Sequence, residues 1–312
     1  NYIKMKKIYS TTLRIFYVTI FMFPILLWSS DIDTNVQNGI NNWEEVPYIQ
    51  PTQQDFGLNK SRNTNSVYTS SGVVNGKFQR GVFIWEDIPY ALPPIGDLRW
   101  KAPRKINSSQ ELIQPKTKNF CIQRTSNFGG SSKYADEGDL ISGSEDCLYL
   151  DIYTPLNKSN KLLPVMFWIH GGGNTSGLKD LYDFRKLVKK HDVIVVRINY
   201  RLGPFGWFTH PAIQGLQNDL DKSSNFGTLD VISALEWVNE NITLFGGDSN
   251  NITLFGESAG GHNVLSLLVS KRAKGLFHKA ISMSGYTTSF SNEDAYRQDI
   301  QSFSSDHTSW KI

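Results

Sequence analysis

The chain has 312 residues, of which 39% are hydrophobic, so it is large enough to bury one sizeable core, and it has no internal repeat that would indicate a solenoid. Its formal net charge is +3, but the first 30 residues hold four bases and no acid, which leaves 28 bases against 29 acids in the remainder. This balance gives no reason to expect a nucleic-acid partner.

The first thirty residues have the pattern of an export signal. Lys6 and Lys7 precede an apolar run over residues 15–28, and two serines follow it. The run is shorter than the roughly 20 apolar residues that a membrane-spanning helix needs. We therefore predict that residues 1–30 are a signal peptide that directs the protein to a secreted, periplasmic or extracellular location. The alternative is a retained membrane anchor, with membrane association through residues 15–28.

Residues 31–66 are rich in Asn, Gln, Asp, Ser and Thr and have few periodic apolar positions. Such a composition has too little to bury, and it predicts a polar, disordered segment. We assign no chemistry to it.

Beyond this segment, from residue 163 onward, short apolar runs alternate with longer segments of helical spacing, the pattern typical of parallel β-α-β units. The first predicted elements are strands over 81–85 and 148–153, which form an antiparallel edge, followed by strands over 163–169 and 193–198. A helix follows, in which Val231, Ala234, Leu235 and Val238 repeat at helical spacing. The last predicted elements are a strand over 252–255, a helix over 259–269 and a strand over 279–283. They predict an α/β fold with a mostly parallel, doubly wound sheet.

The chain has two cysteines, Cys121 and Cys147. An even pair in an exported chain is first interpreted as a disulfide. A bond across a loop of this length would stabilise the fold by about 3 kcal/mol in the chain-entropy model. A catalytic thiol would need a positioned histidine, and neither cysteine has one nearby in sequence.

Residues 256–260 read GESAG and fit the G-x-S-x-G nucleophile elbow. A serine at a sharp turn between a strand and a helix is held in strained backbone angles, and glycines on either side allow the neighbouring elements to pack closely. The alternative is a tight turn with an incidental serine. The predicted strand before Ser258 and the predicted helix after it favour the elbow.

Residues 170–173 read HGGG and follow directly after the predicted strand over 163–169. A hydrolase needs backbone N–H donors for a developing oxyanion at this place, and glycines let those donors approach the substrate oxygen. The alternative is a flexible glycine turn. Together with the elbow, the loop predicts acyl transfer at a serine.

These residues resemble the type-B carboxylesterases and cholinesterase-like proteins, and the similarity extends from about Val67 to Gly285. The matching stretches are IPYALPPIGDLRW (88–100), SEDCLYLDIYTP (144–155), FWIHGGGNTSG (167–177), INYRLGPFGWF (198–208) and NFGTLDVISALEWVNENITLFGGDSNNITLFGESAGG (225–261). The resemblance implies an α/β-hydrolase fold. It also implies that residues 67–312 are the N-terminal part of such a domain, truncated after the nucleophile region.

The resemblance assigns a role to several residues, position by position. It implies that Ser258 is the nucleophile and that the N–H groups of Gly172, Gly173 and Ala259 form the oxyanion hole. Among the neighbours of the site, Glu257 would tune the electric field and His170 would be a structural part of the loop. The remaining assignments are a disulfide between Cys121 and Cys147 and a structural, non-catalytic ion pair between Arg99 and Glu145. The implied substrate is a small-molecule ester, with no metal and no organic cofactor.

In this fold the triad runs serine, acid, histidine, so both partners are expected downstream of Ser258 and outside this chain. We do not expect His262, His278 or His307 to be the base. The chain is thus predicted to be a fragment, or otherwise an inactive truncated product. A sheet that ends near the nucleophile strand would expose an unpaired edge and an uncovered core face.

Three functions remain open. The first is hydrolysis of carboxylic esters, the second is a catalytically inactive cholinesterase-like binding or adhesion module, and the third is hydrolysis of an amide or lactone with the same groups. Residues 122–146 contain no tryptophan, and their only aromatics are Phe128 and Tyr134, which argues against choline esters because the cation-π platform is missing. Asn174 suggests a polar acyl pocket.

Overall fold

The computed structural model describes residues 66–107, 111–116, 119–127, 129–156, 161–217 and 219–287. The predicted signal peptide lies outside the described residues, as do Phe128, His307 and the polar segment up to residue 65. Within the described ranges, no helix combines the length and the apolar character that crossing a bilayer requires.

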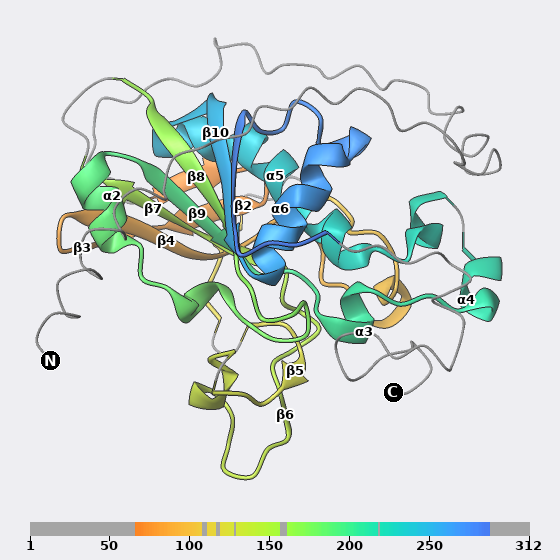
Figure 1. Ribbon diagram of the computed structural model, residues 1–312. Coiled ribbons are helices and arrows are strands. Elements are labelled where there is room, and N and C mark those ends of the chain that lie inside the picture. The colour runs from red at the N-terminus through yellow and green to blue at the C-terminus, as the bar shows by residue number, and fades with distance from the viewer. Residues whose placement is uncertain are drawn as a thin grey trace, which may run out of the picture. The chain divides into compact units, whose positions relative to one another are not determined.

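A seven-stranded sheet forms the centre of the described residues (Figure 1). From one edge to the other, its strands are β11 (Lys279–Met283), β10 (Gly247–Glu257), β8 (Leu163–Ile169), β9 (Ile194–Ile198), β7 (Tyr149–Pro155), β4 (Val82–Pro89) and β3 (Lys77–Gln79). Two short hairpins stand apart from it, β1 (Ser66–Thr69) with β2 (Gly72–Asn75) and β5 (Gln123–Arg124) with β6 (Ile141–Ser142). The predicted strands are all present, and β8 has the predicted bounds.

The sheet is parallel on the side of the predicted nucleophile and antiparallel on the other side. Strands β9, β8, β10 and β11 run parallel, whereas β3, β4, β7 and β9 pair antiparallel. The prediction of an antiparallel edge was partly wrong, because β7 is an interior strand between β4 and β9 and the three-residue β3 is the edge. Strand β7 is buried along its whole length, which fits this interior place.

Helices cover both faces of the sheet, as the doubly wound pattern predicts. Helices α5 (Phe226–Asn241) and α6 (Ala259–Val269) lie on one face, and α2 (Arg185–His191) lies on the other (Figure 1). In β8, Phe167 packs into the core under α5 and α6, and the next residue, Trp168, packs into the core under α2. This alternation follows from the two-residue period of a strand, and the apolar run of β8 is continuous because both faces are covered.

The remaining helices are short. They are the α-helices α3 (Gly203–Gly206) and α4 (Pro211–Gly215) and the 3-10 helices η1 (Gly96–Leu98), η2 (Ser131–Lys133), η3 (Lys179–Leu181), η4 (Asp219–Ser223), η5 (Ile242–Phe245) and η6 (Lys271–Ala273). Among them, η3 directly follows the glycine loop after β8 and is used below.

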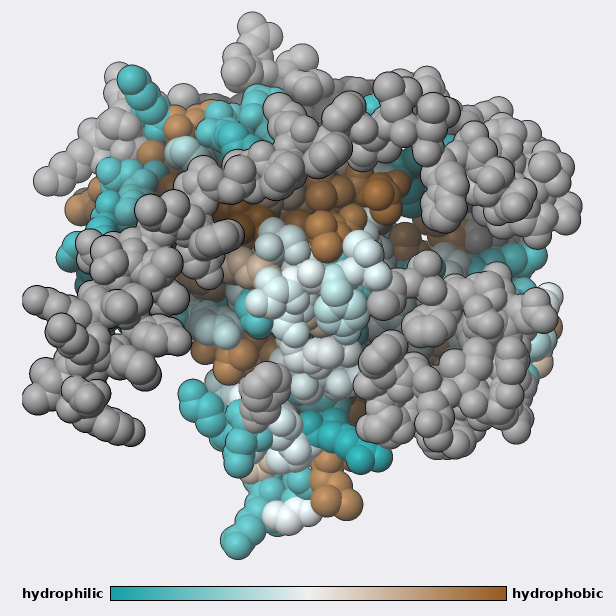
Figure 2. Space-filling view, viewed as in Figure 1, coloured by the Kyte–Doolittle hydropathy of each residue, from teal (hydrophilic) through white to brown (hydrophobic). Residues whose placement is uncertain are grey.

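Apolar side chains are exposed where the described sheet ends. Strand β11 lies one strand beyond β10, and Ile281 and Met283 on it are 45% and 37% exposed. At the end of α6, Leu268 and Val269 are 53% and 85% exposed. Hydrophobic residues gather over α6 on the face seen in Figure 2. Among the described residues, the sheet therefore ends at β11, the predicted strand beside the nucleophile strand, and apolar side chains on it are exposed.

Candidate active site

Ser258 stands alone between the last residue of β10 and the first residue of α6. Its backbone angles are φ 56° and ψ −122°, a conformation that is costly for a residue with a Cβ. The backbone on both sides holds it there, because its N–H donates to the carbonyl of Met283 at 2.8 Å and its carbonyl accepts from the N–H of His262 at 2.9 Å. The side chain is partly exposed. The turn therefore has the strained geometry that was expected of a nucleophile elbow.

The two glycines around Ser258 allow backbones to touch. A Cβ on Gly256 would lie 2.5 Å from the carbonyl carbon of Gly260, and a Cβ on Gly260 would overlap the carbonyl oxygen of Ile169. Real Cβ atoms do not approach this closely, so any larger residue would push α6 away from the ends of β8 and β10. The close approach places the start of α6 directly beside the end of β8, where the glycine loop begins.

The glycine loop passes against the elbow. A Cβ on Gly171 would lie 2.6 Å from the carbonyl oxygen of Glu257 and 3.2 Å from the Cβ of Ser258. Gly172 and Gly173 both have positive φ, 104° and 65°. The loop is folded tightly, because the carbonyl of Gly172 accepts from the N–H of Ser176 at 2.9 Å. The segment predicted to supply an oxyanion hole is thus adjacent to the predicted nucleophile.

None of the three proposed donors has a recorded acceptor among the described residues. Among the described residues, the N–H groups of Gly172 and Gly173 donate to no other group. Ala259 is the first residue of α6, and the N–H at this place has no acceptor within its own helix. It also lies at the positive end of the helix, which favours a developing negative charge.

Gln123 fixes the far end of the glycine loop. Its side-chain oxygen accepts from the N–H of Gly177 at 2.8 Å, and its amide nitrogen donates to the carbonyl of the same residue at 2.8 Å. The amide also donates to the carbonyl of Cys121 at 3.0 Å. Sequence reasoning missed Gln123, and its position two residues after a cysteine was the only signal available.

The predicted disulfide is confirmed, with Cys121 bonded to Cys147 across 26 residues. Arg99 faces Glu145 in the same segment and donates to it from Nε and from Nη2, both at 2.6 Å. The arginine side chain is 41% exposed, so this pair contributes little to stability. Because the disulfide encloses Gln123, it helps to hold the glycine loop as well.

His170 is a buried neutral part of the loop. Its Nδ1 lies 2.8 Å from the carbonyl oxygen of Gly171, and its ring stacks on Tyr200 at 4.4 Å between centroids. Burial lowers the pKa of His170 to about 4, although the hydrogen bond to Gly171 opposes the shift. A ring held in this way supports the loop and is not placed to act as a base toward Ser258.

The other described histidines that form a recorded bond are engaged elsewhere, and among them His210 accepts from the N–H of Ala212 at 3.1 Å. His262 contacts the carbonyl of Tyr286 through Nδ1, and His278 accepts from the N–H of Ile252 at 3.1 Å. Sequence reasoning did not expect either to act as the base. No cluster of His, Cys, Asp or Glu suited to a metal ion occurs among the residues that the structure describes.

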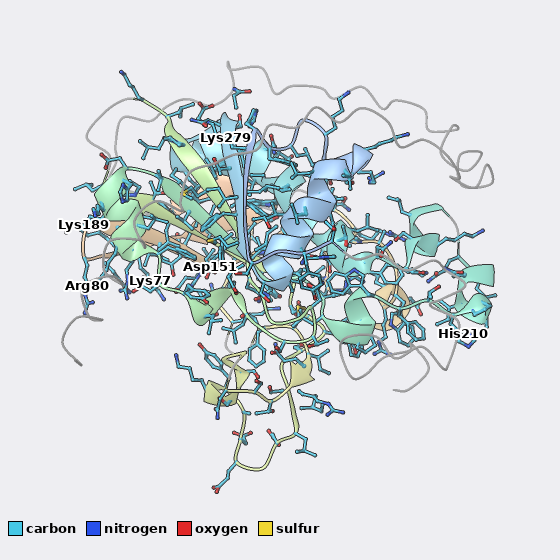
Figure 3. All side chains as sticks on the ribbon, in the orientation of Figure 1. Lys77, Arg80, Asp151, Lys189, His210 and Lys279 are labelled. Atoms are coloured by element: carbon cyan, nitrogen blue, oxygen red, sulfur yellow. A yellow bond between two sulfur atoms is a disulfide. The ribbon has the colours of Figure 1, made fainter. Side chains whose placement is uncertain are left out.

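A buried ion network lies beside the loop, and sequence reasoning missed it. Lys179, the first residue of η3, is 2% exposed and reaches Asp151 and Asp87 at 2.9 Å each. Arg197 on β9 donates from Nε to Asp151 at 2.7 Å and from Nη2 to Asp180 at 2.5 Å. Asp151, labelled in Figure 3, lies on the fully buried strand β7. A charged residue inside an otherwise apolar, fully buried strand was the signal that could have revealed it.

Opposing effects set the pKa of Asp151. Burial would raise it, but the charges of Lys179 and Arg197 outweigh burial and hold the pKa below its ordinary value. Asp151, Lys179 and Arg197 are therefore charged at neutral pH. The network ties η3, which follows the glycine loop, to β7 and β9. The strand before the loop, β8, is itself part of the sheet, so both ends of the loop are held.

The model of the carboxylesterase family matches residues 63–308, which is most of the chain. The chain belongs to the carboxylesterase family. The para-nitrobenzyl esterase of Bacillus subtilis (strain 168) is 42% identical over 203 residues, which cover 64% of this chain and 40% of that protein. Liver carboxylesterase 1F of Rattus norvegicus is 51% identical over 143 residues, 46% of this chain and 24% of that protein.

Solved structures of carboxylesterases show the same fold. A thermophilic pNB esterase matches with a TM-score of 0.64 and 41% identity over 74% of this chain and 46% of its own. A carboxylesterase of Geobacillus stearothermophilus matches with a TM-score of 0.59 and 36% identity, over 69% of this chain and 42% of its own. The predicted α/β-hydrolase fold is thus confirmed. The chain spans less than half the length of these relatives.

Proposed function

We propose that this chain supplies the nucleophile and the oxyanion hole of an exported serine carboxylesterase. The observation that carries the proposal is the contact between the elbow and the glycine loop, where Gly171 leaves no room for a side chain against Glu257 and Ser258. The N–H groups of Gly172, Gly173 and Ala259 remain free around this contact. A strained serine beside unused backbone donors is the arrangement that acyl transfer requires.

The reaction has two steps. Ser258 attacks the ester carbonyl while a histidine takes its proton, and the oxyanion is held by the three N–H groups until the alcohol leaves. Water then attacks the acyl-enzyme and releases the acid. Among the described residues, no histidine bonds to Ser258, and the proposal places both the histidine and the acid of the triad in sequence outside this chain. The chain alone is therefore proposed to be inactive.

The proposed substrates are neutral carboxylic esters. Tyr134, the aromatic of the disulfide loop that the structure describes, packs on Phe120 with centroids 5.5 Å apart. A choline ester would need an exposed aromatic face at its cation, and the loop sequence holds no tryptophan for it. The matched relatives include a para-nitrobenzyl esterase, which also favours esters with an uncharged alcohol part.

Export is part of the proposal. Disulfides persist in oxidising compartments, so the bond between Cys121 and Cys147 supports the signal-peptide interpretation of residues 1–30. A retained membrane anchor is the alternative location. The two are separated by assaying the culture medium and the washed membranes of the same cells.

The test uses the complete coding region that contains this chain, expressed in a secreting host. The medium should hydrolyse p-nitrophenyl acetate, and Ser258→Ala should lower kcat by about 10⁶-fold, as removal of a triad nucleophile does. His262→Ala is the matched control, one helical turn from the nucleophile, and should keep its activity. Hydrolysis that survives Ser258→Ala, or is lost in His262→Ala, would contradict the assigned roles.

A further inference from the structure

Asn174 follows the glycines directly and adopts an unusual backbone. Its φ is 58°, in the left-handed region that costs a residue with a Cβ roughly 1 kcal/mol or more. Asparagine tolerates this region better than most residues, but some contact must still hold it there. The last of the proposed loop donors, Gly173, is the residue immediately before it. Any rotation at Asn174 would therefore move that donor.

The side chain of Asn174 points inward and is bonded to α6. Its Oδ1 accepts from Nδ2 of Asn263 at 2.9 Å, and the hydroxyl of Tyr200 lies 3.4 Å from the same oxygen. Its backbone carbonyl accepts from the N–H of Gly203 at 2.7 Å. The side-chain oxygen is thus occupied inside the protein, and the expectation that Asn174 makes an acyl pocket polar stays a prediction.

Asn263 lies four residues after Ala259 on α6, and its side chain belongs to a residue that is 3% exposed. Residues four apart lie on the same face of a helix, so Asn263 sits one turn below the third proposed donor. Tyr200 completes the link, because its hydroxyl donates to the carbonyl of His170 at 2.6 Å. The first residue of the loop, the residue after its last glycine and the helix of Ala259 are thereby joined through side chains.

We propose that Asn174 and Asn263 are positioning residues that set the spacing between the loop donors and the N–H of Ala259. The inference rests on the proposed function and deepens it. An oxyanion exists only in the transition state and in the intermediates close to it, so an error in donor spacing lowers kcat more than it weakens ground-state binding. Loss of the bridge therefore changes the rate of the chemical step.

The kinetic test uses the full-length protein and p-nitrophenyl acetate. Asn263→Ala and Asn174→Ala should each lower kcat by about 10-fold, with KM changed by no more than about two-fold. The double variant should be no slower than the slower single variant, since either change already breaks the same bond. The affinity for a trifluoromethyl ketone, which forms a tetrahedral adduct, should fall in parallel with kcat/KM.

Asn241→Ala is the matched control. Asn241 is 2% exposed and its side chain accepts from the N–H of Ser70 at 2.8 Å and donates to the carbonyl of Trp237 at 2.9 Å, with no bond to the loop. Its loss should lower stability without changing kcat. Equal effects on kcat in Asn241→Ala and Asn263→Ala, or additive effects of the two bridge variants, would overturn the proposal.

A second measurement does not depend on activity. Hydrogen exchange at the amides of Ser176 and Gly203, which donate to the carbonyls of Gly172 and Asn174, should be faster in Asn263→Ala than in the unsubstituted chain, and unchanged in Asn241→Ala. If Asn263→Ala does not fold, Asn174→Gly takes its place, because glycine accepts the positive φ while it removes the bridge. Unchanged exchange overturns the bridge even if the protein is an esterase. Faster exchange in a protein without esterase activity would support the bridge and reject only the proposed function.

Discussion

The two sides of Ser258 are built in opposite ways. On the braced side, residues 170–181 with strands β7 and β9, polar side chains are buried and bonded, and Asp151 is 0% exposed although it carries a charge. On the open side, the end of α6 and strand β11 (residues 268–283), apolar side chains are exposed, and Val269 reaches 85%. The buried polar bonds are thus concentrated beside the groups that we propose hold an oxyanion.

The braced side is held by buried ion pairs and hydrogen bonds, which water does not reach. Lys179, Arg197 and Asp151 satisfy one another in the interior, where an unpaired charge would cost several kcal/mol. Gln123 and the disulfide act at the far end of the same loop. Within the described part of the open side no ion pair is recorded, and its apolar side chains are exposed.

The largest expected effect comes from breaking the braced side at its centre. Asp151→Ala leaves Lys179 and Arg197 buried without their shared partner, and it should lower the free energy of unfolding by about 3–5 kcal/mol. Urea denaturation followed by tryptophan fluorescence measures this change. Asp183→Ala is the control, because Asp183 also pairs with an arginine, Arg185, but its side chain is 54% exposed. That exposed pair should contribute at most about 1 kcal/mol. Equal losses in the two variants would contradict the importance of burial.

The second effect is a pH dependence on the braced side. The pKa of His170 is about 4 in the folded chain because the ring is buried, and about 6.5 in an unfolded chain. Between these values only the unfolded chain takes up the proton, so the stability that His170 contributes is present above pH 6.5 and is lost as the pH falls toward 4. The expected slope is about 1.4 kcal/mol per pH unit, about 3 kcal/mol in total.

Comparison with His170→Gln isolates this contribution, since other acidic groups also affect stability at low pH. The difference in unfolding free energy between the two proteins should shrink as the pH falls from 6.5 to 4. The ring carbon signals of His170, assigned from the variant, should not titrate between pH 7 and pH 5. A midpoint above pH 6 would show that water reaches the braced side.

The sequence predicts most of the strands and helices on both sides, and those that it does not predict depend on contacts between distant segments. Strand β8 and helix α6 have the predicted bounds because their apolar residues are local, periodic and bordered by the glycines of the loop and the elbow. The interior place of β7 was not predicted, since strand order depends on partners far away in sequence. The start of β10 at Gly247 was missed for a related reason, because its first residues are polar and follow β8 only through an irregular register.

The candidate site also contains residues that the sequence predicts and residues that it does not. Ser258 and the glycines were found because a turn of this shape permits few residue types at fixed spacing. The supporting residues Gln123, Lys179 and Asn263 were not, because each acts through a contact with a distant segment. Position in sequence predicts the candidate reacting groups, whereas the residues that hold them in place are identified only from the folded chain.

The smallest expected effect on stability tests the open side. Ile281 pairs in register with Phe255 on β10 and therefore shares its face, the face of α2, where Phe255 is 6% exposed and Ile281 is 45% exposed. Ile281→Lys removes apolar surface that is already partly in water, so the free energy of unfolding should change by no more than about 0.5 kcal/mol. Self-association of this chain should nevertheless decrease, because a lysine on an edge strand blocks pairing with another copy.

Sedimentation velocity over a range of concentrations measures the association. Leu140→Lys is the control, an equally apolar residue that is 82% exposed at the turn between β5 and β6, away from the main sheet. If association decreases only in Ile281→Lys, the exposed edge is the adhesive surface. If both variants associate as the unsubstituted chain does, the exposed edge is not the surface through which copies associate. If Ile281→Lys unfolds in much less urea, the open side is packed more firmly than its exposure indicates, and it differs less from the braced side than we infer.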